Sequence, residues 1–176
     1  MRTLRSHFVA LLVALALTAT AAHAAPAATK SAVPIDGGAV KAIRHYRATT
    51  LTLQRVMGRR VRFRKLRRVS IERARRVWRR RAVATRERFV HGPAHKSAWL
   101  CIHRYEGAWN DPNAPYYGGL QMDVSFQLHY GRRLYRLKGT ADHWTPLEQI
   151  WVAEKARRSG RGFSPWPNTA RLCGAL

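Results

Sequence analysis

The feature that most constrains the fold of this 176-residue chain is a long basic stretch in its first half. Residues 41–90 hold nineteen Lys and Arg against two Glu, or +17 of the total net charge of +24. Residues 91–176 hold eleven basic and six acidic residues, or only +5. This segregation of charge divides the chain into a basic segment over residues 41–92 and a C-terminal domain over residues 93–176, with a boundary at His91-Gly92-Pro93.

The first 24 residues have the pattern of a secretory signal peptide. Arg2 and Arg5 precede an apolar run over residues 8–17, and Ala22-His23-Ala24 supplies a small-x-small cleavage site. The alternative is an N-terminal membrane anchor, although the apolar run is short for a membrane span. We therefore predict export, followed by a flexible linker rich in Ala, Pro and Gly over residues 25–40.

The basic segment is expected to be helical. Its apolar residues recur at helical spacing in two groups, which are Leu53, Val56 and Met57, and then Ile71, Ala74, Val77 and Trp78. Gly58 predicts a break between two helices. We expect a cationic helical arm that attaches the protein to anionic polymers. The alternative is a solvated spacer whose charge only keeps the chain soluble. The composition would also suit nucleic acid, but export argues against that partner.

The C-terminal domain is expected to be mainly helical with a small strand element, in the α+β class. Apolar residues at three- and four-residue spacing predict an amphipathic helix over residues 96–106, which ends at Gly107. Residues 116–122 are expected to form an extended hairpin around Gly118-Gly119.

Two further helices are predicted from their caps. Asp123 can cap a helix that runs to Gly131. Thr145-Pro146-Leu147-Glu148 has the pattern of a capping box with proline at the first helical position, and the helix that it opens should end before Gly160.

Glu106 is the candidate general acid. It follows Trp99 and Tyr105 and precedes Trp109, and aromatic neighbours disfavour ionisation of a carboxyl group. The partial negative charge at a helix end acts in the same direction. A protonated carboxyl group can donate a proton to a leaving group, which is the chemistry of glycosidic bond cleavage. The alternative is an ordinary helix-terminal carboxylate paired with Arg104 or another arginine.

The turn after Glu106 offers groups that suit a sugar ligand. Gly118 and Gly119 let the backbone approach a ligand closely, and Gln121 can make two hydrogen bonds at once, although a plain hairpin turn explains the same glycines. Aromatic residues can stack on sugar rings but also form cores, and the candidates are Trp109, Tyr116, Tyr117 and Trp166.

These motifs resemble the transglycosylase-like domain of bacterial resuscitation-promoting factors over roughly residues 96–176. The most specific part is the ordered pair of a lone Glu106 and the turn Tyr117-Gly118-Gly119-Leu120-Gln121. The resemblance implies a small lysozyme-like fold, action on peptidoglycan, Glu106 as the catalytic glutamate, and Tyr117, Gly118, Gly119 and Gln121 in the substrate groove. Two features depart from the family pattern. Cys101 lies five residues before the glutamate instead of directly before it, and residues 168–172 separate Trp166-Pro167 from Cys173.

The two cysteines, Cys101 and Cys173, are predicted to form one disulfide, as is usual in an exported chain. Closing so long a loop stabilises a small domain by roughly 4 kcal/mol in the chain-entropy model. Two free thiols, or pairing between chains, are the alternatives.

A second carboxylate would normally be needed for hydrolysis, and Asp111 and Asp123 are the candidates, although they also fit a turn and a helix cap. Without one, Glu106 can act alone as in a lytic transglycosylase, where the sugar's own 6-hydroxyl attacks. His103 lies one turn before Glu106 and is a candidate hydrogen-bond partner, with packing as its alternative.

The sequence therefore predicts a secreted, wall-associated glycosidase or lytic transglycosylase that cleaves peptidoglycan between N-acetylmuramic acid and N-acetylglucosamine. The alternative is a non-catalytic wall-binding protein with the same groove. The expected partners are peptidoglycan glycan strands, anionic wall polymers or an acidic membrane surface bound through the basic segment, and a partner peptidoglycan hydrolase. No cofactor and no metal site are implied.

Overall fold

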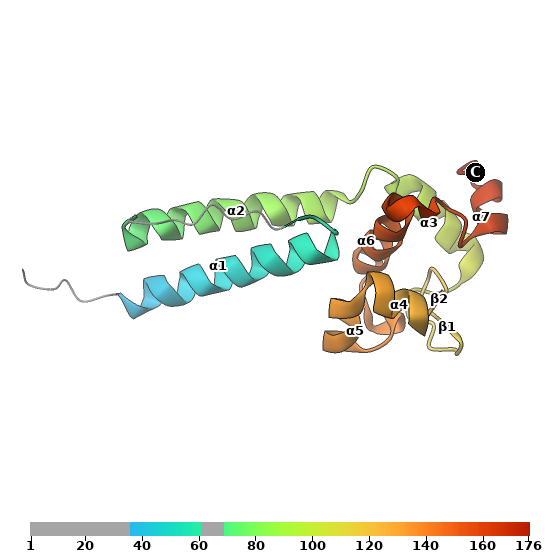
Figure 1. The fold of residues 1–176 in the computed structure, drawn as a ribbon, viewed down its shortest axis with the longest axis horizontal. Helices are drawn as coiled ribbons and strands as arrows, with labels where there is room; N and C mark the ends of the chain where they lie inside the picture. Colours follow the sequence, from blue (N-terminus) through green and yellow to red (C-terminus); the bar gives the residue numbers. More distant parts are fainter. Residues whose placement is uncertain (1–35, 61–68) are drawn as a thin grey trace, which may run out of the picture. The chain divides into compact units, whose positions relative to one another are not determined.

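The computed structural model describes residues 36–60 and 69–176. Within these ranges the protein has seven α-helices and one two-stranded sheet (Figure 1). This confirms the predicted mainly helical α+β class. The predicted signal peptide lies outside the described residues. Among the helices of the described ranges, none combines the length and the apolar character needed to cross a membrane.

Two long helices carry the basic segment. Helix α1 (Gly37–Val56) and helix α2 (Ile71–His91) pack side by side and run in the same direction (Figure 1). Helix α1 begins inside the range expected to be linker because Asp36 caps it, accepting a hydrogen bond of 2.9 Å from the amide of Gly38. Gly58, with φ of +64°, follows the end of α1, as predicted.

The contact between α1 and α2 is made by small and apolar side chains. The buried residues are Ala39 and Thr50 on α1 and Trp78, Ala82 and Thr85 on α2. Most of the arginines of α2 lie on its exposed faces, where water solvates their charge.

The end of this helical pair is joined to the C-terminal domain. Val56 and Met57 belong to the main hydrophobic core. The indole N–H of Trp151 donates a 3.0 Å hydrogen bond to the carbonyl of Phe89 at the end of α2. The basic segment therefore contributes to the core and is more than an attached arm.

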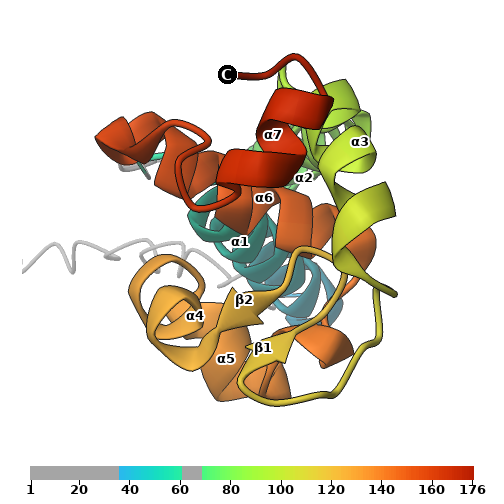
Figure 2. The same ribbon diagram turned by 90° about the vertical axis from the view of Figure 1, so that its right-hand side faces the viewer.

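Helix α6 (Pro146–Ala156) forms the centre of the C-terminal domain. It begins with the predicted capping box, in which Thr145 and Glu148 bond each other's backbone amides. Seven of its residues are buried, from Gln149 to Glu154 and Ala156. Figure 2 shows α6 between α3 and α7 on one side and α4 and α5 on the other; their bounds are Lys96–Glu106, Pro167–Leu172, Val124–Tyr130 and Arg132–Lys138.

The sheet is the predicted hairpin. Strands β1 (Tyr116–Tyr117) and β2 (Met122–Asp123) are antiparallel, with Tyr116 opposite Asp123. Asp123 also caps α4, because its carboxylate accepts a 2.7 Å hydrogen bond from the amide of Phe126. A short 3-10 helix, η1 (Ala141–His143), precedes α6, and a π-helical turn, η2 (Arg157–Arg161), follows it.

The predicted disulfide between Cys101 and Cys173 is present. The residues that separate Trp166-Pro167 from Cys173 form α7, which packs against α3 and brings the second cysteine to the first. One short helix therefore spans the distance between Trp166-Pro167 and Cys173.

Candidate active site around Glu106

Glu106 is the last residue of α3, which ends at Gly107 as the apolar spacing predicted. Its Oε1 accepts a 2.7 Å hydrogen bond from the hydroxyl of Thr169 on α7. The same two helices are joined by the Cys101–Cys173 disulfide. Glu106 follows Cys101, whereas Thr169 precedes Cys173, so the two helices run in opposite directions. The disulfide therefore holds α3 and α7 together close to this hydrogen bond.

The carboxylate of Glu106 has no cationic partner among residues 36–60 and 69–176, where the ion pairs are all made by other acidic residues. Within the same ranges Oε2 has no hydrogen-bond partner. Glu106 is neither fully buried nor fully exposed. A ligand could therefore bond the second oxygen without displacing a described protein group.

Trp99 and Trp166 belong to the core and not to a sugar-binding surface. Trp99 is 0% exposed and packs against Trp166 with ring centroids 4.9 Å apart. Trp166 is 4% exposed, and its indole N–H donates to the carbonyl of Leu120 at 2.7 Å. The structure thus places Trp166 behind the hairpin, where neither face is free for stacking on a sugar.

The hairpin turn lies against the residue that follows Glu106. The side-chain amide of Gln121 donates to Asp111 Oδ2 at 2.9 Å and to the carbonyl of Gly118 at 3.0 Å. A Cβ atom added at Gly107 would lie 3.0 Å from Nε2 of Gln121. The structure therefore places Gly107, the residue after Glu106, beside Asp111 and Gln121 of the hairpin turn.

Asp111 is held as a carboxylate. Hydrogen bonds from the backbone amide of Asn113 and then from the side chain of Gln121 hold the pKa of Asp111 below its ordinary value of 3.8. Asp123, the other candidate, serves as the cap of α4. Of the two, Asp111 is the one beside the hairpin turn and Gly107.

Gly118 and Gly119 are required by close packing beneath the turn. Gly118 has φ of +71°, and a Cβ atom there would lie 2.6 Å from Oε1 of Gln149. A Cβ atom at Gly119 would lie 2.5 Å from Nδ1 of His103 and 2.7 Å from the ring of Trp109. Any larger residue would push the hairpin away from α3 and α6.

His103 supports the hairpin, and its Nδ1 lies 3.0 Å from the carbonyl oxygen of Gly119. Its ring stacks on Trp109, with centroids 3.8 Å apart. Packing, the alternative to a hydrogen bond with Glu106, is therefore what the structure shows for this histidine.

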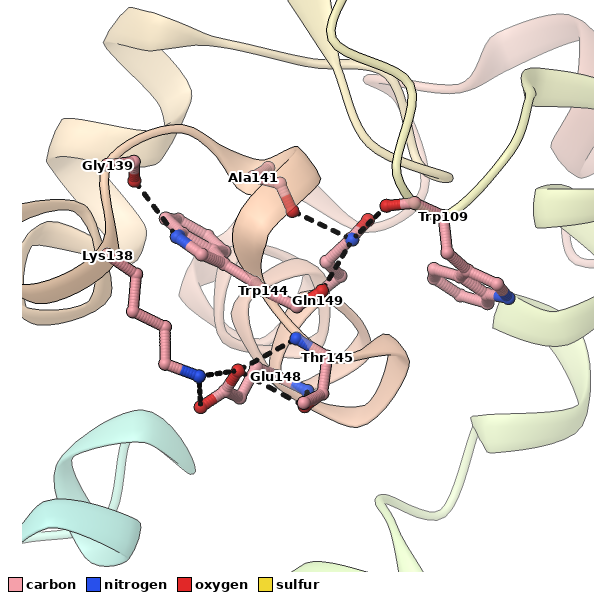
Figure 3. A network of polar contacts seen from close by, with 8 residues as sticks. All are labelled: Trp109, Lys138, Gly139, Ala141, Trp144, Thr145, Glu148 and Gln149. Atoms are coloured by element: carbon pink, nitrogen blue, oxygen red, sulfur yellow. Dashed lines mark hydrogen bonds and ion pairs between the residues drawn. The ribbon is translucent and has the colours of Figure 1, made fainter.

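Gln149 ties the centre of the domain to the loop before the hairpin (Figure 3). Its side-chain amide donates to the carbonyls of Trp109, Ala141 and Trp144 at 2.8, 2.9 and 3.1 Å. Because Gln149 is fully buried on α6, it fixes the position of Trp109 relative to the core. Below it, Glu148 accepts hydrogen bonds from Lys138 and from the amide of Thr145 (Figure 3).

The remaining predicted residues differ in exposure. Tyr116 is 50% exposed, whereas Tyr117 and Trp109 are partly buried against the core. Thr169 and Gln149 are the positioning residues that motif reasoning did not assign to the site. The disulfide offered the one signal for Thr169, since it lies one helical turn from Cys173.

No cluster of His, Cys, Asp and Glu that could hold a metal ion occurs within the part of the chain that the structure describes. No family model, curated protein or solved structure matches this chain.

Proposed function

We propose that this protein is an exported, lysozyme-like enzyme that cleaves the glycan strand of peptidoglycan, with Glu106 as its general acid. The observation that carries the proposal is the state of the Glu106 carboxyl group. Thr169 fixes Oε1 by a 2.7 Å hydrogen bond, and no described arginine neutralises the group. An ion pair would hold Glu106 as a charged carboxylate, whereas a general acid needs a carboxyl oxygen free to reach its substrate.

The elements around Glu106 support the same proposal. A helix that ends in the acid, a short hairpin and a central buried helix follow one another along the chain. This order agrees with the lysozyme-like fold implied by the resemblance to resuscitation-promoting factors. Tyr116, Tyr117 and Trp109 supply aromatic groups for a glycan. Gly118, Gly119 and Gln121 shape the turn beside them, because the two glycine carbonyls and the Gln121 amide already make hydrogen bonds within the protein.

The proposed chemistry uses two proton transfers. Glu106 gives the proton on Oε2 to the glycosidic oxygen as the bond between that oxygen and the anomeric carbon breaks. The resulting carboxylate then accepts a proton from the nucleophile, which bonds to the anomeric carbon. In hydrolysis the nucleophile is water, and in the lytic transglycosylase route it is the 6-hydroxyl of the same sugar.

The hydrogen bonds of Asp111 favour the route in which Glu106 acts alone. Both carboxylate oxygens of Asp111 already accept hydrogen bonds, from Asn113 and from Gln121. A nucleophile or base would have to give up these bonds. We therefore assign Asp111 to positioning the Gln121 turn.

Replacing Glu106 with Gln tests the proposal. An amide of the same shape cannot donate the proton, so we expect cleavage to fall by about a hundredfold to ten-thousandfold while glycan binding is kept. The measurement is mass spectrometry of peptidoglycan digested by the purified protein, which also separates reducing ends from anhydro sugars. Glu87→Gln, on an exposed face of α2, is the matched control.

The rival function is wall binding without catalysis. It would be favoured if the parent protein bound glycan strands but released no fragments, or if Glu106→Gln digested them at the parent rate. The basic helices α1 and α2 are proposed to add attachment to anionic wall polymers or to an acidic membrane surface. A partner peptidoglycan hydrolase would complete the degradation of the wall.

A further inference from the structure

A basic hollow lies away from Glu106, where the end of α1 meets α5 and α6. Its volume is about 620 Å³. Among the described residues, seven cationic side chains line it, namely Arg55, Arg59, Arg60, Arg132, Arg133, Arg136 and Lys155, and no acidic one does. Four of the seven belong to the C-terminal domain, so the hollow is not merely one face of the basic helices.

The walls between these cations are apolar. Val56, Leu134 and Val152 lie at the bottom of the hollow and are almost fully buried. Leu137 stands at its rim with 62% of its surface exposed. A ligand that filled the hollow would therefore meet both positive charge and apolar surface.

The cations of the hollow are not neutralised by the protein. Within the described ranges, none of the seven takes part in an ion pair. Arg133 donates to the hydroxyl of Thr52 at 3.1 Å, and Lys155 donates to the carbonyl of Tyr130 at 2.9 Å. Burial, followed by the charge of Arg158, lowers the pKa of Lys155 below its ordinary value of 10.5. An anion in the hollow would relieve the repulsion among these groups.

We propose that this hollow binds a ligand in which a phosphate group is joined to an apolar part. Several guanidinium groups facing one space can bond the three terminal oxygens of a phosphate monoester in pairs. The apolar part of the ligand would cover Leu137 and the bottom of the hollow. This site is independent of the glycan chemistry proposed for Glu106.

Short-chain phosphatidic acid, kept below its micelle concentration, is the probe, and inorganic phosphate is its companion. We expect calorimetry of the full chain to give at least tenfold tighter binding of the phosphatidic acid. Arg59→Gln with Arg136→Gln should weaken that binding about tenfold or more, because two charge-assisted contacts are lost. Arg44→Gln with Arg86→Gln removes the same charge from exposed positions outside the hollow and should change binding less than about twofold.

Leu137→Asn separates the apolar contribution from the charge. It should weaken binding of phosphatidic acid and leave binding of inorganic phosphate unchanged. Three results would overturn the proposal. They are an equal loss of phosphatidic acid binding in the two double arginine variants, equal affinity of the parent for phosphatidic acid and inorganic phosphate, and no binding of either probe. Binding to phosphatidic acid in phosphatidylcholine vesicles would assign the natural ligand to a membrane, and binding of the dispersed molecule alone would assign it to solution; both results support the site.

Discussion

The hydroxyl of Thr169 bonds Oε1 of Glu106 and leaves Oε2 without a partner among the described residues. Replacing Thr169 with Val removes the 2.7 Å hydrogen bond and keeps the shape of the side chain. We expect the turnover number to fall about tenfold with little change in KM, because the carboxyl group loses its orientation while the glycan contacts remain.

Thr169→Ser is the control, because it keeps the hydroxyl and should restore the turnover number. If Val and Ser variants lost activity equally, the methyl group of Thr169, and not its hydroxyl, would be what matters.

Asp111 positions the hairpin by accepting the amide of Gln121. Asp111→Asn keeps the size of the side chain but removes its negative charge, which weakens the hydrogen bonds that it accepts from Asn113 and Gln121. We expect peptidoglycan digestion to fall less than about tenfold, with most of the effect in KM. A loss as large as that of Glu106→Gln would instead identify Asp111 as a second catalytic carboxylate and favour hydrolysis.

Helix α6 carries a buried acid, Glu154, that joins three parts of the domain. It is 3% exposed and accepts hydrogen bonds from the indole of Trp99 at 2.9 Å and from Arg157 at 3.0 Å. Burial by itself raises the pKa of Glu154, but the hydrogen bonds from Arg157 and Trp99 outweigh it and hold the pKa below its ordinary value of 4.5.

This lowered pKa predicts the acid limit of stability. A carboxyl group with a depressed folded-state pKa stabilises the fold fully above its unfolded pKa, here about 4.5, and that stability is lost as the pH falls through the folded value. Glu154→Gln should lower the free energy of unfolding by roughly 3–5 kcal/mol near neutral pH, because Arg157 is left unpaired. It should also make stability depend less on pH below about pH 4.5. Thermal unfolding between pH 3 and 7 measures both effects. If the loss of stability at acid pH were unchanged in the variant, other carboxyl groups would control it.

The helices that could be predicted from the sequence are those whose ends are marked by nearby residues. The helix that ends at Gly107, the cap at Asp123 and the capping box at Thr145 are each specified by residues within one turn of the element. Helices α5 and α7 were missed because seven and six residues are too few to establish a 3.6-residue period. Their stability comes from tertiary packing, for example of Leu134 and Ala170 in the core.

The candidate site was predictable only in part for the same reason. The motif indicated Glu106, Gly118, Gly119 and Gln121, but the contact between Glu106 and Thr169 spans 63 residues of sequence. Trp166 was expected among the sugar-binding aromatic residues, and the structure assigns it to the core. Its indole N–H reaches a carbonyl 46 residues away, which no local pattern reveals.

For the whole molecule, the basic helices should provide salt-sensitive attachment to anionic walls. Deleting residues 41–90 would remove Val56 and Met57 from the core, so charge substitution is the cleaner experiment. Changing five exposed arginines of α2 to Gln should weaken binding to isolated walls at low salt about tenfold or more; they are Arg73, Arg76, Arg79, Arg80 and Arg86. The same five changed to Lys should bind like the parent, and added salt should reproduce the effect of Gln. If neither the Gln substitutions nor added salt changed binding to the walls, the helices would act only as a spacer.

The Cys101–Cys173 bond closes a loop that contains Glu106, the hairpin and Thr169. Before that bond forms, only tertiary packing, chiefly of Ala170 in the core, holds α7 beside α3, because so short a helix is unstable by itself. If the protein is exported as proposed, oxidation of the two cysteines would be a maturation step, because it completes the contact between α3 and α7 in which Thr169 bonds Glu106.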